Sequence, residues 1–169
     1  MHPALSIPLT AFAGLCAWTL LEYLIHGVLC HRLDTPAGRL HWTHHRDPAR
    51  VFTPLGVWAP AAALLAALSA LVAGPLLGGA FTSGALLGFG AYERQHWRFH
   101  FRAPRSPREA RARAHHLCHH FVNPKAYHGV TTAFWDRAFG TLPDRWEEDH
   151  ARVADRVPLK GASNLGQLW

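Results

Sequence analysis

Histidine is the residue whose placement in this chain is best suited to chemistry. Ten of the fourteen histidines fall into four short groups, which are His26 with His31; His41, His44 and His45; His96 with His100; and His116, His119 and His120. The neutral imidazole ring is the commonest protein ligand for iron, zinc and copper. Ten rings are too many for one ion, so the sequence predicts a site for two metals, each with about four or five nitrogens.

The spacing within the groups favours helices. Residues at i, i+3 and i+4 share one face of an α-helix, and both HxxHH groups and the pair His96 and His100 have this spacing. His26 and His31 do not, because five positions separate two side chains by ~140° on an ideal helix. We therefore expect the first helix to end or loosen between them, near Gly27.

The fourth group, which lies in the sequence HHLCHHF, leaves the choice of ligand open. His115 and His116 both stand at helical spacing from the later histidines, and the HxxHH pattern favours His116. Cys118 offers a soft thiolate ligand, although free cysteines are more often small packed residues. His2 and His150 match no group, and we expect both to be solvated.

Acidic residues are absent from the histidine groups, which disfavours a carboxylate-bridged di-iron site of the bundle type. Glu22 stands four residues before His26, and Glu93 stands three before His96. We expect these carboxylates to hydrogen-bond the outer nitrogens of the ligand imidazoles. His128 is a candidate to line the site beside the ligands.

The segments that must position these histidines are apolar. Hydrophobic residues make up 49% of the 169-residue chain, and no side chain is charged over residues 51–92. A membrane-spanning helix needs ~20 mostly apolar residues. We therefore predict an all-α integral membrane protein with about three apolar helices, over residues 5–25, 55–73 and 76–92.

The last two of these helices should form a hairpin, because Gly74-Pro75 is a strong turn signal. A hairpin returns the chain to the side it left, so all four histidine groups are expected at one face. We predict a single membrane-embedded domain over residues 1–169, with a further helix that starts after Ser106 and runs to His120. The histidine-rich segments 26–50 and 93–142 would cap the apolar helices, and a polar tail over 143–169 would carry a short helix near 144–155.

Charge predicts the orientation of the chain. The formal net charge is +6, and all seventeen Lys and Arg stand at or beyond Arg32. Positive residues mark the cytoplasmic side, so we expect the N-terminus outside and the histidine-rich face in the cytoplasm, as in the inner membrane of a bacterium. Seven arginines between Arg94 and Arg113 favour anionic lipid headgroups over nucleic acid as a partner, and charge that merely fixes topology is the simpler alternative.

Longer motifs carry a resemblance to a known family. EYLIHGVLCH (22–31), HWTHH (41–45), YERQHWRFH (92–100), HHLCHHF (115–121) and YHGVTTAFWDRAFGT (127–141) together resemble the fatty acid hydroxylase / sterol desaturase superfamily. Their spacing is most similar to the fatty acid 2-hydroxylase branch. The resemblance implies that two iron ions are bound by His26, His31, His41, His44, His45, His96, His100, His116, His119 and His120.

The same resemblance implies a reaction and its partners. It implies an O2-dependent membrane di-iron monooxygenase that hydroxylates a lipid, most simply a fatty acyl chain. The chain has no room for the fused cytochrome b5 domain of eukaryotic members, so we expect a separate electron donor of the ferredoxin or cytochrome b5 type. Zinc is expected to replace iron in some isolated protein, because imidazole sites bind zinc well.

Other functions stay open at this point. Desaturation uses the same chemistry, and carotenoid or sterol hydroxylases belong to the same superfamily. A non-enzymatic membrane protein that binds or transports metal is the alternative from another class. A transporter would place its ligands near the bilayer midplane, whereas these histidines stand at the inner boundary, which favours an interfacial active site.

Overall fold

The computed structural model describes residues 3–159, and within that range the chain contains helices and no strand. The predicted all-α class is therefore confirmed for this part of the chain. The helices in order are α1 (Pro3–Leu24), the π-helix η1 (Ile25–Cys30), α2 (Pro36–Arg46), α3 (Leu55–Phe101), α4 (Pro107–Phe121), α5 (Phe134–Ala138) and α6 (Trp146–Val153). His2 and residues 160–169 of the predicted polar tail lie outside the described residues.

The first helix loosens where the histidine spacing requires it. α1 continues directly into η1, whose hydrogen bonds run from residue i to i+5. Five positions then make about one turn, so His26 and His31 come to one side, with ring centroids 5.2 Å apart. The expectation of a loosened helix near Gly27 is confirmed, and it takes the form of a π-helix.

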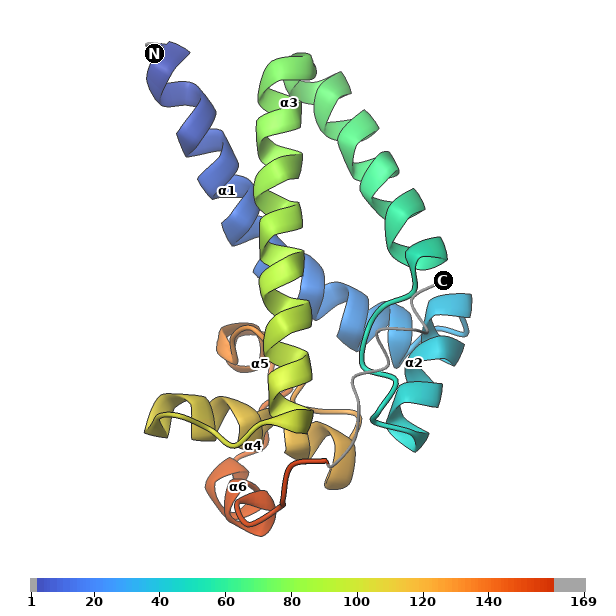
Figure 1. The fold of residues 1–169 in the computed structure, drawn as a ribbon, viewed down its shortest axis with the longest axis vertical. Helices are drawn as coiled ribbons and strands as arrows, with labels where there is room; N and C mark the ends of the chain where they lie inside the picture. Colours follow the sequence, from blue (N-terminus) through green and yellow to red (C-terminus); the bar gives the residue numbers. More distant parts are fainter. Residues whose placement is uncertain (1–2, 160–169) are drawn as a thin grey trace.

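α3 is a helical hairpin, as Figure 1 shows. The chain reverses at Gly74, whose φ of 77° and ψ of 164° are open to glycine and strained for other residues. The second arm runs from Pro75 to Phe101 and is longer than the predicted 76–92. Apolar composition marks where a bilayer can end, whereas Glu93 and Arg94 are good helix formers that let the helix continue into the polar region.

α1 packs against the second arm of α3 at small residues. A Cβ atom at Gly84 would collide with the carbonyl oxygen of Ala11, and one at Gly14 would collide with that of Phe81. Small residues at such crossings let two apolar helices approach closely. In Figure 1 α1 passes beside the second arm, and both reach the end of the molecule that carries α2, α4 and α6.

Two stretches of the described chain are long and apolar enough to cross a membrane, Leu5–Cys30 and Leu55–Phe101. In the most apolar 18 residues of the second stretch, only 6% is buried inside the protein. The core helix of a soluble protein is, by contrast, mostly buried. Leu71 and Val72, near the hairpin turn, are more than four-fifths exposed. An apolar surface of this extent fits a lipid environment.

The polar end has a small core of its own. Ala114, Leu117 and Cys118 of α4 pack with Val153 of α6 and with Tyr127. α4 begins after Ser106, whose hydroxyl accepts from the N–H of Glu109 as a helix cap, and α6 lies within the predicted 144–155. Both helix predictions are confirmed, and this core holds α4 against α6.

Candidate metal centre

The four histidine groups of the sequence rearrange into two clusters of five. The first cluster consists of His26, His31, His41, His45 and His119. The second cluster consists of His44, His96, His100, His116 and His120. Within each cluster, one ring nitrogen from every histidine lies within 4.8 Å of those of the other four.

Each HxxHH motif divides between the two clusters. On α2, His41 and His45 at i and i+4 join the first cluster, and the i+3 residue His44 joins the second. On α4 the i and i+4 histidines join the second cluster, and His119 joins the first. Position i+3 lies ~60° round the helix from i, so one helical turn can serve two neighbouring sites.

The distances between donor nitrogens fit a shared metal ion. His26 Nε2 lies 3.1 Å from His41 Nε2 and 3.0 Å from His119 Nε2. In the second cluster, His116 Nε2 lies 2.8 Å from His100 Nε2. Two nitrogens at right angles on one ion, each ~2.1 Å from it, stand ~3.0 Å apart. The donor type and the spacing therefore both suit a first-row transition metal.

Backbone carbonyls orient two ligands of the first cluster. The Nδ1–H of His26 donates to the carbonyl of His128 at 2.5 Å, and the Nδ1–H of His119 donates to that of Ala126 at 2.8 Å. A carbonyl can only accept, so the proton lies on Nδ1 in both rings. The lone pair is then on Nε2, the nitrogen that faces the cluster.

Asp136 holds the loop that supplies these carbonyls. Its carboxylate accepts from the N–H groups of His128 and Gly129, both at 2.8 Å, from the Thr141 hydroxyl at 2.7 Å and from His115 Nε2 at 3.0 Å. Burial alone raises the pKa of Asp136, but the hydrogen bond from His115 and the other donors lower it to about 2. A charged, fully buried aspartate thus organises residues 126–130.

His115 is therefore occupied outside both clusters, and the structure places His116 in the second one. Cys118 is fully buried in the core between α4 and α6 and belongs to neither cluster. The prediction that His150 is solvated is wrong. Its ring is half-buried beside Trp146 and 5.9 Å from that of His115.

The two glutamates contact backbone and hydroxyl groups rather than imidazoles in residues 3–159, unlike the sequence expectation. Glu22 accepts from the N–H groups of Val130 and Thr131 at 2.6 and 2.9 Å. Glu93 accepts from the hydroxyl and the N–H of Thr53 at 2.7 and 3.2 Å. Each carboxylate shares a helix with a cluster histidine but reaches a different segment, because packing brings an N–H within its range. Glu22 thus ties α1 to the end of the 126–130 loop and to Thr131, the residue that follows it.

His128 contributes to the first cluster through its backbone, and its side chain also lies beside it. The ring is 1% exposed, and its centroid is 5.4 Å from that of His119 and 5.6 Å from that of His31. Sequence reasoning missed Asp136, although it stands in the YHGVTTAFWDRAFGT motif as a carboxylate among apolar and small residues. Its role depends on contacts with the 126–130 loop and with α4 that no local spacing encodes.

Burial keeps the cluster imidazoles neutral. Desolvation, followed by repulsion from neighbouring imidazoles, lowers the pKa of His31 to about 3, and desolvation lowers that of His45 to about 4. Desolvation also lowers the pKa of five other cluster histidines well below the ordinary value. These are His41, His44, His116, His119 and His120. Only the neutral ring binds a metal, so these rings are in the ligand form at neutral pH.

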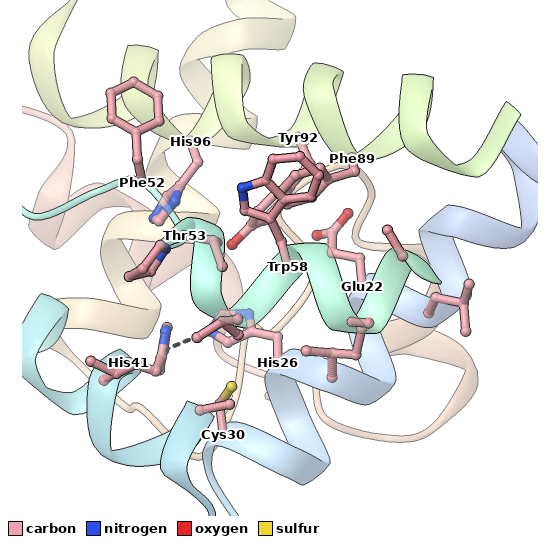
Figure 2. Close-up of a pocket in the computed structure, with 18 of the residues that line it drawn as sticks. Glu22, His26, Cys30, His41, Phe52, Thr53, Trp58, Phe89, Tyr92 and His96 are labelled. Atoms are coloured by element: carbon pink, nitrogen blue, oxygen red, sulfur yellow. Dashed lines mark hydrogen bonds between the residues drawn. The ribbon is translucent and has the colours of Figure 1, made fainter. Parts of the chain in front are cut away.

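An apolar cavity of about 300 Å³ reaches both clusters. His26 and His41 of the first cluster and His44 and His96 of the second lie in its wall. Its other walls come largely from apolar side chains of α1 and of both arms of α3. Figure 2 shows Trp58, Phe89 and Tyr92 on the α3 side, with Glu22, His26 and Cys30 from the α1 side. The cavity therefore forms one continuous apolar space that extends from between α1 and the two arms of α3 to the histidines.

Comparison with known proteins agrees with this geometry. Residues 11–141 match the model of the fatty acid hydroxylase family. The chain is 35% identical over 140 residues to dihydroceramide fatty acyl 2-hydroxylase FAH2 of Arabidopsis thaliana, which covers 77% of this chain and 59% of the relative. It is 31% identical over 159 residues to human fatty acid 2-hydroxylase, which covers 81% of this chain and 41% of the relative.

A solved structure is also similar. The structure of full-length scs7p, in which only the hydroxylase domain is visible, aligns with a TM-score of 0.75 and 26% identity, over 95% of this chain and 61% of that one. The chain thus spans about 40 to 60% of the length of the curated relatives described above. The family match covers most of the chain and includes all ten cluster histidines. The chain belongs to the fatty acid hydroxylase family.

Proposed function

We propose that this chain is a membrane monooxygenase that uses O2 to hydroxylate a fatty acyl chain of a lipid. The observation that carries the proposal is the apolar cavity whose wall includes histidines of both clusters. The names of the relatives, a dihydroceramide fatty acyl 2-hydroxylase and a fatty acid 2-hydroxylase, support an acyl chain as the substrate.

Two iron ions would be held by the two clusters. The first would be bound by His26, His31, His41, His45 and His119, and the second by His44, His96, His100, His116 and His120. When bound, iron supplies the redox chemistry that activates O2. Zinc suits the same nitrogens and is expected to occupy them in part of the isolated protein.

The protein's own residues position the substrate and exclude water. Trp58 and Phe89 form an apolar wall, with ring centroids 5.9 Å apart, against which an alkyl chain can lie. The histidines at the polar end of the same cavity set which carbon of the chain comes close to the metals. The apolar walls also keep water from competing with the substrate.

The chain is proposed to act as one membrane-embedded domain, with its N-terminus outside and the histidine-rich face in the cytoplasm. The basic residues support this orientation, because all of them follow Leu29 and none lies in the uncharged stretch 51–92 of the hairpin. Electrons would come from a separate donor of the ferredoxin or cytochrome b5 type, and the membrane would be a bacterial inner membrane. Single cysteines placed at Asp47 and at Arg102 should be labelled from the same side.

The test is a comparison of lipid extracts from a strain that lacks the gene and a strain that overexpresses it. We expect hydroxylated acyl chains in the second extract only, with the added oxygen derived from O2. Cells that express His44→Ala at equal abundance provide the matched control. A new double bond in place of the hydroxyl would reassign the chain as a desaturase, and identical extracts from cells whose protein holds both metals would contradict an oxygenase.

A further inference from the structure

A second cavity, of about 390 Å³, lies against the second arm of α3 and the start of α4. Four arginines line it, Arg94, Arg98, Arg105 and Arg108, together with a single acidic residue, Glu109. None of the cluster histidines lines this cavity, and it shares no lining residue with the apolar cavity.

The two cavities lie on opposite faces of one helix. Tyr92 and His96 line the apolar cavity, and Arg94 and Arg98 line the basic one. Two positions along an α-helix correspond to a rotation of ~200°, which places Arg94 on the far side from Tyr92. A ligand of the basic cavity is therefore a different molecule from an acyl chain that reaches the histidines.

The basic cavity keeps an excess of positive charge. Glu109 is engaged by Arg98, whose Nη2 lies 2.6 Å from Oε1, and by the N–H of Arg105, which donates to Oε2 at 2.8 Å. Within residues 3–159, neither Arg94 nor Arg108 lies within ion-pair distance of a carboxylate. One carboxylate among four guanidinium groups leaves three positive charges around the cavity.

The position of the cavity along the chain matches the surface of a bilayer. Arg94 is the first basic residue after the uncharged stretch 51–92, and it is exposed on the same helix. A helix that leaves the hydrocarbon region passes next through the layer of lipid phosphates. Basic pockets at this depth bind anionic headgroups, because guanidinium groups pair with phosphate oxygens in a bidentate manner.

We propose that this cavity binds the phosphate headgroup of an anionic phospholipid of the surrounding bilayer. The proposal requires that α3 is embedded in a membrane, and it needs neither the metals nor the hydroxylation reaction. Binding of the lipid would also position α4. The cavity includes the first turn of α4, and the same helix carries His116, His119 and His120 at its other end, so the bound lipid would fix the height of these ligands above the membrane.

The test uses the metal-loaded full chain in a neutral detergent and measures its melting temperature with added lipid. Phosphatidylglycerol should raise the melting temperature by about 5 °C more than phosphatidylcholine with the same acyl chains. The double variant Arg94→Gln/Arg108→Gln should lose this difference. The control Arg39→Gln, which removes an exposed arginine paired with Asp34, should retain it.

Two further arms separate the other sources of the same chemistry. Inorganic phosphate should not reproduce the effect at millimolar concentration. If it does so in an arginine-dependent way, the cavity is a site for a soluble anion and the proposal is wrong. Equal melting temperatures with the two lipids would also overturn the proposal. If, in that case, the double variant lost turnover only when the electron donor was limiting, the basic cavity would be assigned to binding of an acidic carrier protein.

Discussion

The two histidine clusters are built by different means, although each has five imidazoles. In the first cluster, two rings are oriented by carbonyls of the 126–130 loop, and that loop depends on the buried carboxylate of Asp136. In the second cluster, the described residues give the Nδ1 atoms of His96, His116 and His120 no hydrogen-bond partner. Aromatic rings pack against both clusters: in the second, Tyr92 lies stacked 5.5 Å from His96 and Phe99 lies 5.8 Å from His116, and in the first, Trp42 lies 5.2 Å from His31. The first site thus depends on hydrogen bonds from a distant loop in addition to packing, and the second depends on helix packing.

Removal of a ligand should have the largest effect, and it should fall on one cluster at a time. His119→Ala takes a ligand from the first cluster, and His44→Ala takes one from the second. We expect each variant to lose hydroxylation, with metal content falling from about two equivalents per chain to about one. Metal analysis and lipid analysis of purified protein measure both, and His150→Ala is the control that should keep both metals.

Asp136→Asn should weaken the first cluster and spare the second. An amide keeps one carbonyl oxygen but places an NH2 group where the other oxygen accepted hydrogen bonds, so one of the two loop N–H groups, that of His128 or that of Gly129, loses its acceptor. Loss of a group that orients a ligand typically costs ~10–100-fold in metal affinity. Stepwise removal of metal with a chelator should show one weakened site out of two. Asp144→Asn, at an exposed residue, should match the wild type, and equal weakening of both sites would contradict the separation.

Phe99→Leu should weaken the second cluster and spare the first, and its effect on metal affinity should be smaller than that of Asp136→Asn. Phe99 is 1% exposed, and its replacement leaves space beside His116 without removing a hydrogen bond. We expect a several-fold loss of metal affinity at the second cluster only, measured by the same chelator titration. Phe134→Leu changes an exposed ring and provides the matched control. A first cluster that weakened instead would show that helix packing supports both sites alike.

The smallest effect concerns acid pH. The pKa of Asp136 is about 2 in the fold and has an ordinary value of 3.8, so its ionised form stabilises the folded state at pH values above about 4. This contribution should be lost as the pH falls from about 4 to 2. The difference in melting temperature between the wild type and Asp136→Asn should therefore narrow over that interval. A difference that stays constant down to pH 2 would show that folding does not lower the pKa of Asp136.

Local spacing predicted much of the fold. The turn at Gly74, the start of α4 after Ser106 and the loosened helix near Gly27 each depend on a few neighbouring residues, and the structure has all three. The four histidine groups were visible for the same reason. Their division into two clusters was not, because that division depends on how α2 and α4 are oriented toward α1 and α3.

Contacts between distant segments were the part that sequence reasoning could not supply. Glu22 and Val130 are separated by 108 positions, and spacing along one helix pointed to an imidazole instead of that N–H. Asp136 gave no signal of its role, since its partners come from α4 and from the loop. The half-buried state of His150 likewise follows from the packing of α6 on α4, which no motif records.

The shared use of single helical turns by both clusters would set the separation of the two proposed metal ions. On α2 and again on α4, neighbouring histidines on one backbone turn serve different clusters. Tilting α1 or α3 in a thicker or thinner membrane would move ligands at the outer edges of the pair. The spacing between the ions would stay that of a hydrogen-bonded helical turn, one of the stiffest short lengths a polypeptide offers. α2 and α4 would therefore hold the distance between the two metal ions constant when the thickness of the surrounding membrane changes.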